Sequence, residues 1–137
     1  MARAFLDTNI IVYANDRADP EKQHTALTLI GTLFRSGTGV ISTQVLMEYA
    51  AVASRKLGQS REAIHRQTIN LERLGVVPIS GELIRNGLDL AALYSVFFRD
   101  GVILSAARYS ECAVLWTEDL THRQLYAGVE ARNPFEQ

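Results

Sequence analysis

The chain has 137 residues, of which 47% are apolar and 21% are charged, enough for one domain with a hydrophobic core. Its net charge of -1 argues against a purely basic nucleic-acid binder, and no apolar run approaches the ~18 residues of a membrane span. A single cysteine, Cys112, excludes an internal disulfide and a cysteine-based zinc site. Because a secretory leader has no room before Asp7, we predict a soluble, cytoplasmic protein with one domain over residues 1–137.

Short apolar strands alternate with amphipathic helices along the sequence. In chain order, the predicted elements are a strand at 4–6, a helix at 21–34, a strand at 39–42, helices at 45–57 and 61–74, a strand at 75–79, helices at 82–98 and 101–110, and strands at 113–117 and 129–132. The second to fourth strands are apolar and β-branched, which is typical of buried parallel strands. We therefore predict an α/β fold with a mostly parallel central sheet and helices on both sides.

Acidic side chains follow the ends of these predicted strands. Asp7 comes directly after the first strand, and Asp119 comes just after the strand that ends at Thr117. Glu48 lies about a turn and a half into the helix that follows the strand at 39–42. Ligands of open α/β sheets bind outside the carboxyl ends of the strands, so these three acids are expected at one edge. Asp100 joins them if the helix after it begins at that edge.

Each acid taken alone has a structural explanation. Asp7 and Asp100 could cap helices, Asp119 could belong to a turn, and Glu48 could be a solvated helix residue. Crowded together, however, four carboxylates would repel one another and cost stability. A hard divalent cation such as Mg²⁺ or Mn²⁺ removes that cost, because it prefers oxygen ligands. The sequence therefore predicts a metal site whose activated water cleaves a phosphodiester or a smaller phosphate ester.

The distribution of charge is compatible with a nucleic-acid substrate. With four of the 15 acids placed in one site, 11 acids remain against 14 basic residues, and 12 of those are arginine. The planar guanidinium of arginine donates two hydrogen bonds at once to phosphate. Arginine is equally common on ordinary protein surfaces, so this feature does not establish the substrate.

Five segments in order resemble the PIN-domain ribonucleases, specifically the VapC-type toxins of bacterial toxin–antitoxin pairs. They are Phe5-Leu6-Asp7-Thr8-Asn9, Gln44-Val45-Leu46-Met47-Glu48, Asp100-Gly101-Val102-Ile103-Leu104-Ser105-Ala106-Ala107, Thr117-Glu118-Asp119-Leu120 and Asn133-Pro134-Phe135. The order, spacing and total length match, so the resemblance covers essentially the whole chain. It implies a parallel sheet with helices on both sides and a metal-dependent endoribonuclease that acts as the toxin of a type II pair.

The resemblance also implies roles for single residues. Asp7 and Asp100 would be the principal ligands of Mg²⁺ or Mn²⁺, and Glu48 and Asp119 would complete the acidic cluster directly or through water. The resemblance also implies that Thr8, Asn9 and Thr117 orient these carboxylates through hydrogen bonds. Members of the family usually form homodimers and are held inactive by a small antitoxin that lays a segment over the site.

The segment around Asp100 departs from the family pattern. An aromatic residue often precedes this acid in the family and alanine often follows it, whereas this chain has Arg99 and Gly101. Gly101 weakens the start of a helix by roughly 0.5–1 kcal/mol relative to alanine. Arg99 places a cation beside the acids, where it could contact the scissile phosphate or pair with a carboxylate. Pairing is the interpretation that we favour.

Other functions remain open from the sequence. A haloacid-dehalogenase-type phosphatase needs a second Asp at position 9, which is Asn9 here. An inactive RNA- or protein-binding module and a housekeeping RNA-processing nuclease are further alternatives. No spacing of His24, His65 and His122 favours a metal-free ribonuclease. Residues 91–94 and 96–98 carry more apolar side chains than one core face needs. We expect most of them in the core, with a dimer surface as the alternative.

Overall fold

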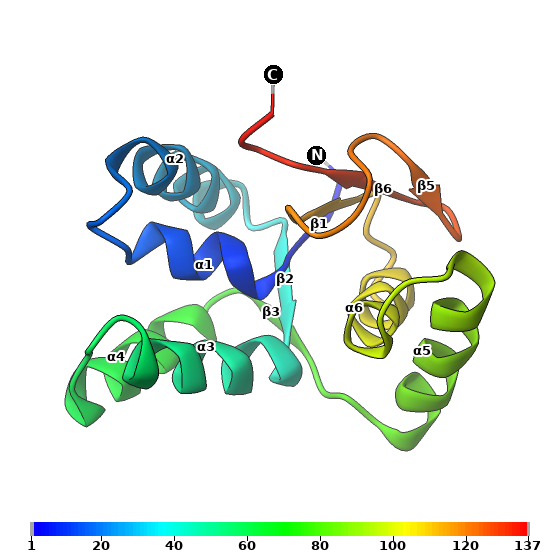
Figure 1. The fold of residues 1–137 in the computed structure, drawn as a ribbon, viewed down its shortest axis with the longest axis horizontal. Coiled ribbons are helices and arrows are strands. Elements are labelled where there is room, and N and C mark those ends of the chain that lie inside the picture. Colours follow the sequence, from blue (N-terminus) through cyan, green and yellow to red (C-terminus); the bar gives the residue numbers. More distant parts are fainter. Residues whose placement is uncertain (1, 137) are drawn as a thin grey trace.

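The computed structural model describes residues 2–136, and a six-stranded sheet forms its centre (Figure 1). The strand order is β3-β2-β1-β4-β6-β5, and every neighbouring pair is parallel except the antiparallel β5 and β6. The strands are β1 (Ala4–Leu6), β2 (Gly39–Ser42), β3 (Gly75–Val77), β4 (Val114–Trp116), β5 (Leu125–Tyr126) and β6 (Val129–Arg132).

Helices lie on both sides of the strands, with α1 to α4 on one side of β1 and β2 in Figure 1 and α5 and α6 on the other. They are α1 (Thr8–Ala14), α2 (Pro20–Ser36), α3 (Thr43–Arg55), α4 (Arg61–Leu71), α5 (Gly81–Tyr94) and α6 (Phe98–Tyr109). The predicted fold, a mostly parallel central sheet covered on both sides, is confirmed. Within residues 2–136 no single helix is long and apolar enough to cross a membrane; α5 and α6 meet that test only as a pair bent by 115°.

The central strands are buried because their side chains are apolar on both faces. All residues of β1 and β2 are buried, and Leu115 in β4 is fully inaccessible. The strand predicted at 75–79 is shorter and more exposed than expected. It ends at Val77 because Pro78 has no amide hydrogen to continue the ladder, and β3 lies at the edge of the sheet with Gly75 exposed.

Two helix boundaries near Asp100 differ from the prediction. The helix expected at 82–98 ends at Tyr94, because Ser95 adopts a left-handed conformation with φ 55°. The next helix begins at Phe98 rather than Gly101, so Asp100 lies inside the first turn and is not a capping residue. The expectation that most apolar residues of 91–94 and 96–98 enter the core is also wrong, since Leu93 is 70% exposed and Phe97 is 81% exposed.

Helices α5 and α6 approach each other through two glycines. A Cβ atom at position 101 would overlap the carbonyl oxygen of Gly87. A Cβ atom at position 87 would lie 2.7 Å from Cγ2 and 2.9 Å from Cα of Val102. Glycine at position 101 costs some helix stability, but it permits a close backbone contact. This contact holds the first turn of α6, including Asp100, against α5.

Candidate metal centre

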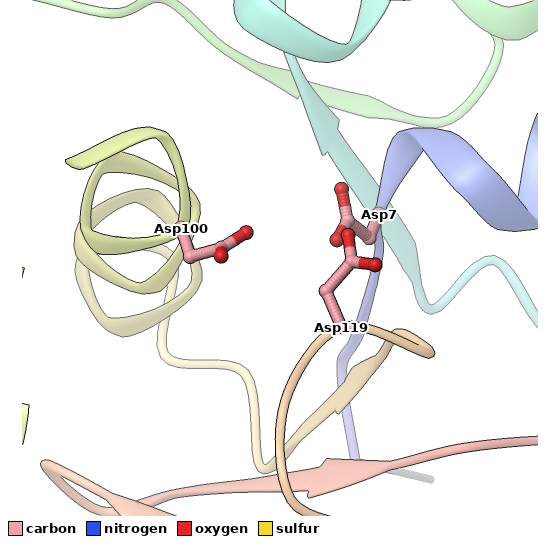
Figure 2. A group of neighbouring side chains, drawn as sticks. All are labelled: Asp7, Asp100 and Asp119. Atoms are coloured by element: carbon pink, nitrogen blue, oxygen red, sulfur yellow. The ribbon is translucent and has the colours of Figure 1, made fainter. Parts of the chain in front are cut away.

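Four acidic side chains converge where the parallel strands end. Asp7 follows β1, Asp119 follows β4, Asp100 comes from the first turn of α6 and Glu48 comes from α3. Figure 2 shows Asp7, Asp100 and Asp119 extending toward one another from three separate elements. One carboxylate oxygen from each of these three residues lies within 4.8 Å of the other two. Within residues 2–136 it is the one such cluster, and it contains no histidine.

Asp7 is fixed by hydrogen bonds on its buried side. It is 1% exposed and its carboxylate accepts the backbone N–H of Thr8 at 2.7 Å, which caps α1. The hydroxyl of Thr117 donates to the other oxygen at 2.8 Å. Asp7 can therefore cap α1 and also serve as a metal ligand, because one of its oxygens caps the helix while the carboxylate group still faces the cluster.

Glu48 is held in a similar way, so the alternative of a solvated helix residue is wrong. Thr8 donates its hydroxyl to Glu48 Oε1 at 2.6 Å, and Gln44 donates one turn earlier on α3 at 3.4 Å to Oε2. Burial alone would raise the pKa of Glu48, but hydrogen bonds from Arg99 and Thr8 hold it below its ordinary value. Gln44 also donates to the carbonyl oxygen of Arg99 at 3.2 Å and so links α3 to α6.

Asp100 and Asp119 are less well supplied with donors. Burial, together with the charges of Asp7 and Glu48, raises the pKa of Asp100 although Arg99 opposes the shift. Burial and the charges of Asp7 and Asp100 likewise raise the pKa of Asp119. Asn9 donates to Asp119 Oδ2 at 3.0 Å. Both carboxylates therefore hold their protons more strongly than an ordinary aspartate.

The guanidinium of Arg99 lies among all four acids. It donates to Asp7 Oδ1 at 2.6 Å, to Glu48 Oε1 at 2.7 Å and to Asp100 Oδ1 at 2.6 Å, and it lies 3.5 Å from Asp119 Oδ2. Burial alone would lower the pKa of Arg99, but the hydrogen bonds and charges of Asp7 and Glu48 outweigh burial, so the pKa is raised overall. The pairing with a carboxylate that we favoured is present, and it involves four partners instead of one.

Comparison with known proteins identifies the family. The family model of the PIN domain matches residues 4–128. The chain belongs to the PIN-domain family. No curated protein sequence matches the chain significantly. PIN domains are nucleases that use divalent metal ions, so the acidic cluster is the candidate metal centre of this domain.

Solved structures share this PIN fold along nearly the whole chain. A VapBC complex bound to DNA from Salmonella typhimurium is 18% identical with a TM-score of 0.70, and a toxin–antitoxin complex from Klebsiella pneumoniae is 20% identical with a TM-score of 0.69. Each comparison covers 98% of this chain and 99% of the other. The sarcin–ricin-loop-cleaving toxin VapC20 of Mycobacterium tuberculosis is 20% identical with a TM-score of 0.66, over 85% of this chain and 89% of the other.

The residues of this PIN domain fit a hard divalent ion. The donor set consists of carboxylate oxygens, which Mg²⁺ and Mn²⁺ prefer. Four acids this close need a positive charge between them, and in this structure the guanidinium of Arg99 supplies it. The contact of Gln44 with Glu48 was not predicted from the sequence. The spacing of four residues along one helix, which brings two side chains together, could have indicated it.

A groove opens from the acidic cluster along α1 and α3. Its volume is about 490 Å³, and Arg55 and Lys56 line it at the carboxyl end of α3. Thr8, Asn9, Glu48, Arg99 and Asp119 belong to the same groove. Its floor is partly apolar, with Val12 and Val52 among the lining residues. The groove therefore combines an acidic end that suits a metal ion with a basic end that suits a phosphate chain.

Proposed function

We propose that the chain is a Mg²⁺- or Mn²⁺-dependent endoribonuclease and the toxin of a toxin–antitoxin pair. The observation that carries the proposal is the convergence of Asp7, Glu48, Asp100 and Asp119 beside a groove that Arg55 and Lys56 also line. The known structures that share its fold support the toxin role, because they are structures of a toxin and of toxin–antitoxin complexes.

In the proposed mechanism, Asp7, Asp100 and Asp119 would hold the metal, and Glu48 would complete the cluster directly or through water. A divalent ion bound there lowers the pKa of water and stabilises the charge that develops on the phosphate. Thr8 keeps Glu48 in place, Thr117 keeps Asp7 in place, and Asn9 does the same for Asp119. These bonds keep the carboxylates oriented before the substrate arrives.

The basic end of the groove would bind the RNA backbone. Arg55 and Lys56 are exposed, and both line the groove that Glu48 and Asp119 of the acidic cluster also line. Phosphate contacts of this kind position a nucleic acid without reading its sequence. The metal end and the basic end would then hold neighbouring phosphates of one strand.

Two kinds of protein partner belong to the proposal. A small antitoxin would cover the groove with an inserted segment. A second copy of the chain would pack on the exposed apolar side chains of α5 and α6, among them Leu93 at 70% exposure and Tyr109 at 69%. Light scattering should give the mass of a dimer for the wild type and of a monomer for Leu93→Asp. A monomeric wild type would contradict this part of the proposal.

The direct test uses purified protein, a pool of cellular RNA and Mn²⁺. Asp7→Asn and Asp100→Asn should each lose metal-dependent cleavage while keeping the wild-type circular dichroism spectrum. Asp89→Asn is the matched control, because Asp89 is an exposed residue of α5 outside the cluster, and it should cleave normally. Full activity in Asp7→Asn would remove the metal mechanism.

A growth experiment separates the toxin from a housekeeping nuclease. Expression of the wild type alone should slow bacterial growth, and co-expression of the small protein encoded next to it should restore growth. If the protein cleaves RNA in vitro but its expression does not slow growth, the nuclease activity is supported and the toxin role is contradicted.

A further inference from the structure

The guanidinium of Arg99 uses all three of its nitrogen atoms inside the acidic cluster. Nε donates to Glu48 Oε2 at 3.0 Å, Nη1 donates to Asp100 Oδ1 at 2.6 Å, and Nη2 donates to Asp7 Oδ1 at 2.6 Å. These distances are typical of strong, charge-assisted hydrogen bonds. The side chain of Arg99 therefore fills the space between the carboxylates instead of lying at their margin.

The carboxylates that hold Arg99 are the same ones that would hold the metal. Asp7, Asp100 and Asp119 form the cluster with ligand oxygens within 4.8 Å of one another, and Arg99 contacts each of them. The guanidinium takes up oxygens of all three acids, and its positive charge repels a second cation at such short distances. A divalent ion at the cluster and Arg99 in its present position exclude each other.

The groove beside the cluster offers the side chain of Arg99 a second place to lie. This side chain is 33% exposed, and it lines the groove that continues toward Arg55 and Lys56. The neighbouring Asp100 would stay in place, because α6 is fixed against α5 through Gly101 and Gly87. Rotation about the side-chain bonds of Arg99 would move the guanidinium into the groove and leave the acids where they are.

We propose that Arg99 is an internal cation that competes with the metal: it neutralises the cluster in the metal-free protein and must be displaced before a divalent ion binds. The proposal rests on the metal site of the proposed function and adds a property of this chain to it. The apparent metal affinity is the intrinsic affinity multiplied by the fraction of molecules in which Arg99 has left the cluster. If Arg99 occupies the cluster in ~90% of molecules, the affinity falls about tenfold.

The test measures metal binding directly, without RNA. Wild type, Arg99→Met and Arg108→Met are stripped of metal with a chelator and titrated with Mn²⁺ by calorimetry. Arg99→Met keeps an unbranched apolar side chain and removes the charge. Arg108→Met makes the same change in net charge at an exposed position of the same helix. Arg99→Met should bind Mn²⁺ about tenfold more tightly or better, and Arg108→Met should bind like the wild type.

Thermal unfolding gives a second readout. In chelator, Arg99→Met should melt at a lower temperature than the wild type, because four acids then lack their cation. Mn²⁺ should raise its melting temperature by more than it raises that of the wild type. If Arg99→Met does not fold without metal, Arg99→Lys decides. Its single ammonium makes fewer of these bonds, so it should bind Mn²⁺ more tightly than the wild type does.

The proposal would be overturned if a folded Arg99→Met bound Mn²⁺ no more tightly than the wild type does. If Arg99→Met does not fold, the same result in Arg99→Lys would overturn it. If the wild type nevertheless cleaves RNA with Mn²⁺, the proposed function survives and the competition by Arg99 alone is wrong. If neither the wild type nor the variants bind Mn²⁺, both the competition and the metal-dependent function are wrong.

Discussion

The acidic cluster has two sides that are held differently, one formed by Asp7 and Glu48 and the other by Asp100 and Asp119. On the first side, Asp7 and Glu48 receive hydroxyl hydrogen bonds from Thr117 and Thr8, and the pKa of Glu48 is lowered. On the second side, burial raises the pKa of Asp100 and of Asp119, and the charge of Arg99 opposes both shifts. The first side is therefore oriented by hydroxyl groups, whereas ionisation of the second side is favoured by the cation that occupies the cluster.

The largest expected effect tests this difference by removing one carboxylate from each side. Asp7→Asn should lower the affinity for Mn²⁺ by at least ~100-fold, because it removes a buried ligand that the fold holds in place. Asp119→Asn should lower the affinity by only ~10-fold, because water can reach that position and replace the ligand. Calorimetric titration of both variants measures the ratio. Equal losses would mean that the two sides contribute alike.

A hydroxyl that links the two sides should give the next largest effect. Thr117 donates to Asp7 and accepts the backbone N–H of Asp119 at 3.0 Å. Thr117→Val keeps the shape of the side chain but removes both bonds, and we expect Mn²⁺ affinity to fall about 10–100-fold. Thr25→Val, which removes a hydroxyl from the surface of α2, is the control. Unchanged affinity in Thr117→Val would show that the orientation of Asp7 does not depend on this residue.

A smaller effect is expected from pH. Metal binding requires ionised carboxylates, and the raised pKa values of Asp100 and Asp119 mean that these two protonate at a higher pH than an ordinary aspartate. Mn²⁺ affinity should therefore decline on acidification before the usual range near pH ~4 is reached. The decline should be shallower in Asp119→Asn, which lacks one of the two groups. Identical pH profiles for wild type and variant would contradict the assignment to Asp119.

The pKa shifts also affect the free energy of unfolding of the metal-free protein. The shifts of Asp100 and Asp119 act in one direction and the shift of Glu48 acts in the other. The folded state binds the protons of Asp100 and Asp119 more tightly than the unfolded state does, so their contribution is present at low pH and is lost as pH rises through the folded pKa values. The contribution of Glu48 has the opposite sign, because its pKa is lowered. It is present above the ordinary pKa of glutamate and is lost as pH falls. The free energy of unfolding in urea, measured in chelator at several pH values for Glu48→Gln and Asp119→Asn, separates the contribution of Glu48 from that of Asp119.

The sequence predicted the positions of the two acids that directly follow strands better than the position of Asp100. The ends of β1 and β4 place Asp7 and Asp119 at one edge by topology alone, and the strand pattern was sufficient for that. The position of Asp100 required the family resemblance, because the apolar run through residues 91–98 hides the break at Ser95. Local patterns also missed the two-residue strand β5 and the seven-residue helix α1.

The contacts of Arg99 could not be predicted in full from the sequence. Its position beside Asp100 indicated one ion pair, but the side chain reaches Asp7 and Glu48, which lie 92 and 51 positions away in the chain. Which carboxylates a long side chain reaches depends on the direction of α6 relative to β1 and α3. That direction is set by tertiary packing and leaves no local pattern in the sequence.

The contact between Gly87 and Gly101 ties the position of the metal centre to a helix that contributes no acid to it. A methyl group at position 101 has no room while the backbone of α5 lies against it. Gly101→Ala should therefore force α5 and α6 apart at this point, and Asp100, which precedes the contact in the same helical turn, should shift with α6.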